Sequence, residues 1–416
     1  MKRILPVING IVLALSLYSS AAFAQPTPGY SLQKITQTQL DIKQKKAPGL
    51  FRIKTGVFCT SPIESANGTL VTGCDDASIR FISSAGNLLK TVKVDHDANS
   101  GMSANPELIV LHTKTEQFIV TSYGDQLIMK IDSSGKVMTK TKLDVTVSKP
   151  YGFNNGDYFF LGADGVGHFV LENNSPVNID ISSADLNTPS SHVNAKGEDE
   201  VVVSDNHGSL YVVQASGTKK EIKISNQQLS DVRFAPDGKV WVSDATGIMY
   251  IVNLETNDVK SFQVPLAKNF NRPVFLKNGK VVFGAGDSIF IYGAQNYEKP
   301  EAIYNSSIRQ QEFESGATSN YIGSPMPGVD FSVVEIADGS EYIWVPTHGG
   351  YHFIDDRGAV AGYFSYGANL GDAETFSAPV RLKDGSFALG MFYGIDRVSI
   401  NKNASGKQIT SGTWLP

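Results

Sequence analysis

Short hydrophobic stretches, separated by polar turns, recur along most of the chain. In the clearest copy, residues 234–252 contain an Asp-Gly turn, an apolar stretch, a turn of small residues and a further apolar stretch. The same phrase returns at 275–283 and 382–390. The stretches are rich in β-branched and aromatic residues, and Asp-Gly or Asn-Gly pairs favour tight hairpins. The pattern therefore predicts antiparallel strands, and helical periodicity is almost absent.

The second stretch of each copy recurs at a nearly fixed interval. It begins near Thr69, Phe118, Tyr158, Val201, Val240, Val281, Tyr342 and Phe387. Most steps are about 40 to 45 residues, which with four short strands per copy is the signature of a propeller. We therefore predict an all-β fold, a single β-propeller of eight four-stranded blades. The alternative is a propeller of seven blades, in which the first or the last unit supplies strands to another blade instead of forming its own.

The repeat also sets the expected domain boundaries. Residues 1–24 form a predicted signal peptide, 25–55 a flexible leader, and 56–416 the propeller. The longest step contains an expected insertion loop at 297–328, because long connections often carry function. Residues 51–55 offer a possible edge strand that would help to close the ring.

The first residues have the composition of a secretory signal. A basic start is followed by an apolar stretch over 4–18 and by Ala22-Phe23-Ala24, a small-residue cleavage site. The apolar stretch is shorter than the roughly 20 residues needed to span a membrane. The residue directly after the predicted cut at Ala24 is Gln25 and not Cys, so a lipoprotein anchor is not predicted. We expect a periplasmic protein, with secretion as the alternative.

The two cysteines, Cys59 and Cys74, flank the turn at 65–68. If these strands form a hairpin with an even loop, the two residues lie directly opposite each other. Opposed residues in a non-hydrogen-bonded pair lie within disulfide reach. Because export permits oxidation, we predict a Cys59–Cys74 disulfide.

The charge balance narrows the range of partners. The formal net charge is −5, and loss of Lys2 and Arg3 with the signal makes it more negative. This balance favours neither nucleic acid nor an anionic membrane as a partner. We expect a monomer that engages a protein partner or a small envelope ligand.

With these repeats established, the chain from about residue 55 onward resembles the bacterial exported β-propellers of the pyrroloquinoline-quinone-like repeat superfamily. The resemblance rests on the form of the repeat, best seen at 237–252, and implies the propeller fold. The quinoprotein dehydrogenases of this superfamily carry a tryptophan motif in most blades and a disulfide between adjacent cysteines. Here there are only 3 Trp residues, and Cys59 and Cys74 are separated, so the resemblance does not imply quinone chemistry or any other cofactor.

Polar residues that enter the innermost strands are the first candidates for a binding site near the mouth of the central channel. They are Tyr151, Asp231, Arg272, Asp330 and Arg381. The two arginines offer a clamp for a carboxylate or phosphate, and Tyr366 in a long inter-blade loop offers an aromatic wall. The alternative is that these groups pair with neighbouring blades.

Two further sets of residues invite a metal assignment. His348 and His352 are the nearest approach to a pair of metal ligands. His348 lies at the expected turn between the second and third strands of its unit, so a role in the turn is the preferred explanation for it. Asp recurs at the equivalent turn as Asp76, Asp125, Asp164, Asp205, Asp244 and Asp287. A carboxylate ring would suit a structural Ca²⁺ or a basic partner, whereas Asp also bonds its own turn backbone. We favour the turn role and assign no metal site and no catalytic residue.

No nucleophile elbow, phosphate-binding loop or His-Glu-x-x-His motif occurs in the sequence. We therefore expect a non-catalytic exported propeller that acts as a protein- or ligand-binding scaffold in the cell envelope. The alternative is a lactonase- or lyase-like enzyme with its site at the channel mouth.

Overall fold

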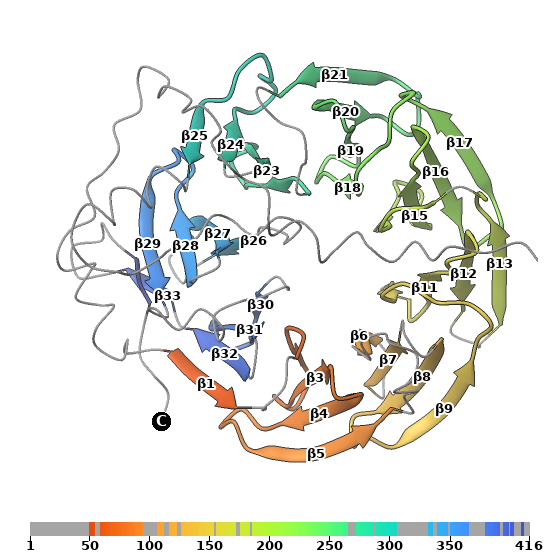
Figure 1. The fold of residues 1–416 in the computed structure, drawn as a ribbon, viewed down its shortest axis with the longest axis vertical. Coiled ribbons are helices and arrows are strands. Elements are labelled where there is room, and N and C mark those ends of the chain that lie inside the picture. Colours follow the sequence, from red (N-terminus) through yellow and green to blue (C-terminus); the bar gives the residue numbers. More distant parts are fainter. Residues whose placement is uncertain are drawn as a thin grey trace, which may run out of the picture. The chain divides into compact units, whose positions relative to one another are not determined.

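A computed structural model describes residues 50–54, 59–94, 106–111, 116–122, 126–153, 155–171, 175–183, 185–264, 272–285, 288–305, 332–335, 339–347, 350–365, 379–391, 394–398, 400–402 and 409–411. The chain divides into two units, Met1–Leu32 and Gln33–Pro416, and every described residue belongs to the second. Within this unit the described elements are all strands, arranged as an eight-bladed propeller (Figure 1). The fold prediction of eight four-stranded blades is confirmed.

The first four blades use consecutive strands, which pair antiparallel in chain order. Blade 1 contains β2 (Ile63–Glu64), β3 (Leu70–Cys74), β4 (Ser78–Ile82) and β5 (Leu88–Lys93). Blade 2 contains β6 (Pro106–Leu111), β7 (Gln117–Ser122), β8 (Leu127–Asp132) and β9 (Val137–Lys142). Blade 3 contains β10 (Tyr151–Gly152), β11 (Tyr158–Leu161), β12 (Val166–Val170) and β13 (Pro176–Asp180). Blade 4 contains β14 (Ser190–Val193), β15 (Asp199–Ser204), β16 (Ser209–Gln214) and β17 (Lys219–Lys223).

The next three blades follow the same order, and the last blade is completed from the N-terminal side of the fold. Blade 5 contains β18 (Arg233–Phe234), β19 (Val240–Ser243), β20 (Ile248–Val252) and β21 (Val259–Gln263). Blade 6 contains β22 (Val274–Phe275), β23 (Val281–Ala285), β24 (Ser288–Tyr292) and β25 (Ala302–Asn305). Blade 7 contains β26 (Ser332–Glu335), β27 (Glu341–Thr347), β28 (Gly350–Ile354) and β29 (Val360–Ser365). Blade 8 contains β30 (Val380–Arg381), β31 (Phe387–Met391), β32 (Gly394–Val398) and β1 (Leu50–Lys54), and a hairpin of β33 (Ile400–Lys402) and β34 (Ile409–Ser411) follows.

Strand β1 closes the ring by supplying the outer strand of blade 8. It pairs antiparallel with β32, from Leu50 opposite Val398 to Lys54 opposite Gly394. The expected edge strand is thus confirmed one residue earlier than the predicted 51–55. The propeller thus includes residues 50–54, which lie within the predicted flexible leader at 25–55, and it begins earlier than the predicted residue 56. Of that leader, residues 25–49 lie outside the described residues, as does the predicted signal peptide.

The strand order gives the propeller two distinct ends. At one, which we call the connection end, each outer strand passes to the inner strand of the next blade, and the turn between second and third strands lies there too. At the other, the hairpin end, lie the turns between first and second and between third and fourth strands. Antiparallel neighbours reverse direction at every turn, so these assignments follow from the pairing alone.

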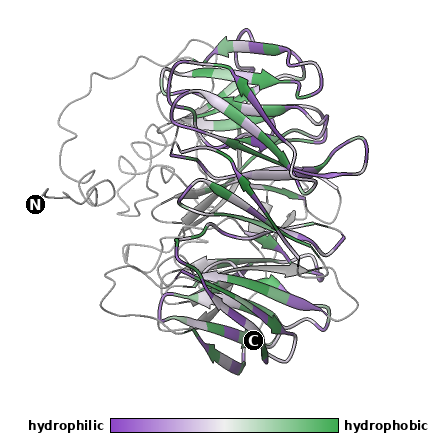
Figure 2. Cartoon of the chain, turned by 90° about the vertical axis from the view of Figure 1, so that its right-hand side faces the viewer, coloured by the Kyte–Doolittle hydropathy of each residue, from purple (hydrophilic) through white to green (hydrophobic). Residues whose placement is uncertain are grey.

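The hydrophobic core lies between neighbouring blades, as expected for units that cannot bury an apolar face alone. Val71 and Phe81 of blade 1 pack with Phe118 and Met129 of blade 2 in one buried cluster. Similar clusters join blade 2 through to blade 7, and the rings of Trp344 and Phe387 lie 5.9 Å apart between blades 7 and 8. Figure 2 shows the hydrophobic segments concentrated in the strands and the hydrophilic ones at the turns.

The predicted disulfide is confirmed, although the hairpin around it differs from the prediction. Cys59 and Cys74 are bonded, with their Cα atoms 4.0 Å apart and both side chains buried. The loop is odd, because Ile63 pairs with Val71 and the Ser65 N–H donates to the Thr69 carbonyl. A one-residue register shift before Ile63, in a stretch containing Pro62, restores the opposition of the two cysteines.

The glycines of the Asp-Gly and Asn-Gly pairs occupy the conformation that the sequence predicted. Gly68, Gly156, Gly238, Gly279, Gly339 and Gly385 have φ values between 78° and 91°. Only glycine adopts this region without steric cost. Each of these glycines lies in a turn that is longer than a two-residue hairpin turn. In blade 1 the Gly68 N–H donates to the Ser65 carbonyl, and in blade 5 the Gly238 N–H donates to the Ala235 carbonyl.

The predicted insertion loop begins later than expected. Residues 302–305 form β25, the outer strand of blade 6, and Tyr297 stacks on Phe262 with ring centroids 5.3 Å apart. The first part of 297–328 therefore belongs to the blade itself. Residues 306–331 lie between β25 and β26 and are outside the described residues.

Candidate functional site

A charged pair at the connection end joins three successive blades. Asp231 precedes β18, and Arg272 precedes β22 of the next blade. Arg272 donates from Nε and Nη2 to Asp231 Oδ2 at 3.2 and 3.1 Å. The Thr188 backbone N–H, at the entry to blade 4, donates to Asp231 Oδ1 at 2.9 Å. One carboxylate thus binds groups from the blades on both sides, with charge-assisted hydrogen bonds.

Asp231 and Arg272 pair with groups of neighbouring blades, which is the alternative predicted for them from the sequence. The Arg272 side chain is only 14% exposed, against 37% for Asp231. Its guanidinium is engaged in this pair, so it frames the connection end instead of presenting a free clamp. This pair is the part of the predicted site that the structure brings together.

Arg381 lies at the opposite end from Arg272. Strand β30 has only two residues, and the turn at 382–386 follows at once, so Arg381 lies at the hairpin end. Its Nη1 is 3.9 Å from Glu335 Oε2 of blade 7, and Lys277 Nζ of blade 6 is 2.6 Å from the same oxygen. The hydrogen bond from Lys277 holds the pKa of Glu335 below its usual value. The expectation that both arginines meet at one mouth was therefore wrong.

The remaining predicted site residues do not join the pair. Tyr151 in β10 is partly buried and packs against the cluster between blades 3 and 4, which includes Phe153 and Val201. Its ring therefore contributes to an inter-blade contact. Asp330, His348 and Tyr366 lie outside the described residues.

The recurrent turn aspartates use their carboxylates within the turn. Asp244 Oδ1 accepts the backbone N–H groups of Thr246 and Ile248 at 2.9 and 3.2 Å, and Oδ2 accepts the Tyr250 hydroxyl at 2.8 Å. Asp205 repeats this pattern with His207, Ser209 and Tyr211. Burial alone would raise the pKa of Asp244, but the hydrogen bond from the Thr246 hydroxyl at 2.6 Å, together with the other three, holds the pKa below its usual value.

The other two described turn aspartates are also engaged within their own blades. Asp76 Oδ2 lies 3.0 Å from Arg80 Nη2 and 3.4 Å from Lys93 Nζ. Asp164 Oδ1 accepts the Val166 N–H at 3.2 Å. Asp125 and Asp287 lie outside the described residues. Across the described part of the chain, no group of three or more His, Cys, Asp or Glu side chains is placed to hold a metal ion.

The hairpin end carries a set of inter-blade carboxylates that sequence reasoning missed. Each caps a backbone N–H in the first turn of the preceding blade. Glu116 accepts from Ala66 at 2.6 and 2.8 Å, Glu341 from Lys277 at 2.7 Å, and Glu64 from Lys383 at 2.6 Å. Two of them, Glu116 and Glu341, lie where the second strand of a blade begins. A glutamate that recurs at this position is the sequence signal from which the inter-blade cap could have been predicted.

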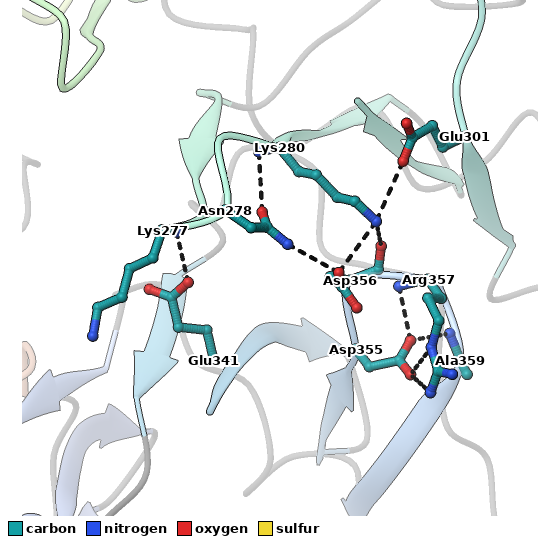
Figure 3. A network of polar contacts seen from close by, with 9 residues as sticks. All are labelled: Lys277, Asn278, Lys280, Glu301, Glu341, Asp355, Asp356, Arg357 and Ala359. Carbon is teal, nitrogen blue, oxygen red and sulfur yellow. Dashed lines mark hydrogen bonds and ion pairs between the residues drawn. The ribbon is translucent and has the colours of Figure 1, made fainter. Parts of the chain in front are cut away.

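Between blades 6 and 7 these contacts extend into a charged network (Figure 3). Lys280 donates from Nζ to the Asp356 carbonyl at 2.9 Å and lies 3.3 Å from Glu301 Oε2. Burial would lower the pKa of Lys280, but the hydrogen bonds and charges of Asp356 and Glu301 raise the pKa above its usual value. The network links an inner turn of one blade to the outer turn of the next.

Comparisons with known proteins show the fold alone. No family model and no curated protein matches the chain. Among solved structures, the Dos1 propeller matches with a TM-score of 0.62 and 10% identity over 89% of this chain and 96% of that one. The computationally designed Ika8 protein matches with a TM-score of 0.60 and 14% identity over 84% and 99%. A streptogramin B lyase gives a TM-score of 0.49 and 13% identity over 72% and 94%.

These similarities place the chain among the β-propellers. No helix in the described part of the chain is long and apolar enough to cross a membrane.

Proposed function

We propose that this protein is a non-catalytic, exported β-propeller that binds a protein or ligand of the cell envelope through its connection end. The observation that carries the proposal is the bonding of Asp231 and Arg272 across blades 4, 5 and 6. These groups, which the sequence offered as binding candidates, instead join neighbouring blades to one another. They form a rigid frame around the entry points of the inter-blade connections.

The chain topology supports the choice of this end. Residues 306–331 connect β25 to β26, and 366–379 connect β29 to β30, so both stretches start and finish at the connection end. They are longer than the connection between β17 and β18, which spans 224–232. Long connections held by a rigid scaffold are where proteins commonly place binding residues.

Two observations support the export of the protein in this proposal. The predicted signal peptide over 1–24 directs the chain out of the cytoplasm, and the Cys59–Cys74 disulfide suits an oxidising compartment. Membership of the pyrroloquinoline-quinone-like repeat superfamily and a periplasmic location, with secretion as the alternative, belong to the same proposal. The lactonase- or lyase-like alternative rests on the sequence argument only.

The proposal is tested by in-cell cross-linking followed by capture of the protein from the cell that exports it. Wild type is compared with a variant lacking residues 306–328 and with the control Lys239→Ala, which changes a side chain at the hairpin end. We expect the deletion to lose at least one specific partner that both other proteins retain. An unchanged partner set in the deletion variant would overturn the proposal. Stoichiometric Ca²⁺ or Zn²⁺ in the purified protein would favour the enzyme alternative.

A further inference from the structure

The outer rim of blades 1 and 2 carries an unusual concentration of exposed apolar side chains. In the described part of the chain six large hydrophobic residues are exposed, and four of them begin the two outer strands β5 and β9. Leu88 and Leu89 are 58% and 59% exposed, and Val137 and Met138 are 40% and 48% exposed. Single exposed apolar residues need no explanation, whereas a contiguous group does.

The same backbone irregularity presents both pairs of residues. In blade 1, Ile82 pairs with Leu88 and Phe81 with Lys90, so Leu89 is an extra residue in the strand. In blade 2, Ile131 pairs with Val137 and Lys130 with Thr139, which makes Met138 the extra residue. A β-bulge bends its strand and re-aims side chains. The two bulges stand at equivalent positions of their blades.

A hydrogen bond joins strand β5 to the turn that precedes strand β9. Lys90 of β5 donates from Nζ to the Ser134 carbonyl at 2.8 Å, in the turn that leads into β9. A Cβ on Gly135 of that turn would lie 3.0 Å from the Lys90 side chain. Strands β5 and β9 follow one another along the rim of the ring (Figure 1). We call strands β5 and β9, with the four exposed apolar residues that begin them and the turn before β9, the blade 1–2 rim.

The blade 1–2 rim has a local excess of lysine, although Asp76 lies 3.4 Å from Lys93 and Asp132 lies near Lys136. Strands β5 and β9 contain Lys90, Lys93, Lys140 and Lys142 and no acidic residue, and Lys136 precedes β9. Other outer strands are basic too, such as β17 with three lysines beside Glu221, so the rim is set apart by having lysines together with exposed apolar residues. The whole chain has a formal net charge of −5, so its average hides this local basic region.

We propose that the blade 1–2 rim docks the protein onto an anionic lipid bilayer. Exposed apolar side chains flanked by lysines match an interface in which acyl chains lie beneath negative headgroups, and lysine stems reach from one region to the other. The surface lies on the outer strands, apart from the connection end that carries the proposed function. The net charge of the whole chain did not predict attraction to an anionic membrane.

Two other occupants fit the rim less well. A second copy of this chain placed edge to edge on β9 would bring lysines against lysines, and like charges across strands are unfavourable. A partner strand added to either edge would meet the bulge at Leu89 or Met138, and bulges block regular pairing. An anionic lipid bilayer needs no strand register and no pocket on the rim in order to bind it.

The experiment is co-sedimentation of the exported protein with vesicles of phosphatidylcholine, with and without phosphatidylglycerol. One variant combines Leu89→Ser with Met138→Ser, and a second combines Lys136→Glu with Lys142→Glu. The matched control combines Val259→Ser with Lys260→Glu on β21, where Val259 is 41% exposed. We expect wild type and control to bind the anionic vesicles at least about tenfold more strongly than either rim variant, and binding to weaken as salt rises.

Equal binding to both kinds of vesicle, or rim variants that bind like wild type, would overturn the proposal. So would a concentration-dependent dimer of the wild type that the rim variants abolish, because the rim would then be an interface between copies. Thermal unfolding of each variant shows that the fold is intact. Little change is expected there, since the substituted side chains are exposed.

Discussion

Asp244 illustrates at the scale of one residue how this chain uses chemistry-bearing side chains. Its carboxylate is almost completely buried, accepts hydrogen bonds from two backbone N–H groups of its own turn, and also accepts the Tyr250 hydroxyl. A carboxylate satisfied in this way is stabilised in its charged form. Such a residue anchors the connection between two strands. The repetition at Asp205 makes this a feature of the repeat.

Replacing Asp244 by Ala should destabilise the protein by about 3 kcal/mol, because the hydroxyls of Tyr250 and Thr246 and two N–H groups lose their acceptor. Urea unfolding at neutral pH measures this loss. Asp164→Ala is the control, since Asp164 is exposed and accepts a single backbone hydrogen bond at 3.2 Å. The control should change the free energy of unfolding much less. Similar losses in the two variants would contradict the turn role of Asp244.

The pH dependence of the Asp244→Ala effect follows from the lowered pKa of Asp244. A carboxyl whose folded pKa is depressed contributes stability above the unfolded pKa, which is about 3.9 for Asp, and loses it as pH falls through the folded pKa. The difference in unfolding free energy between wild type and variant should therefore shrink below about pH 4. A difference that grows on acidification would refute the assignment.

At the scale of elements, the repeat made most strands predictable, and what it missed came from contacts between copies. The second strands begin within two residues of the expected positions, as at Val240, Val281 and Phe387. The capping role of Glu116 and Glu341 depends on which blade lies next to which, and a single strand pattern does not contain this information. Arg381 was misplaced because an inner strand of two residues cannot be told from a longer one by its pattern.

The disulfide belongs to the element scale, because it fixes the segment before β2 to the end of β3. Cys59 and Cys74 also lie in the cluster that contains Leu382 and Ile395 of blade 8, at the closure of the ring. Replacing both by serine removes a cross-link over about 15 residues, a loss worth about 3 kcal/mol. We expect a lower midpoint of thermal unfolding for the double serine variant.

Wild type treated with a reductant is the companion sample in this comparison. Its midpoint should move toward that of the double serine variant, whereas the reductant should leave the variant unchanged. A double serine variant as stable as oxidised wild type would show that the disulfide does not hold the closure.

At the scale of the whole molecule, the eight blades and their closing strand form a frame with two different ends. The hairpin end is held by carboxylates that cap turns of neighbouring blades, and the connection end by the Asp231–Arg272 pair. The frame follows from the repeat, and the sequence predicted it. The proposed binding surface could not be predicted equally well, because the connections assigned to it interrupt the repeat and share no sequence pattern with it.

Site-specific photo-cross-linking in the exporting cell tests most directly whether the connection end is the binding face. A photoreactive residue replaces Gln227 or Thr246, which are exposed at the connection end, or Asp237 or Lys277 at the hairpin end. The account predicts that one partner is captured from positions 227 and 246 and not from 237 and 277. Capture of that partner from the hairpin end, with none from the connection end, would contradict it.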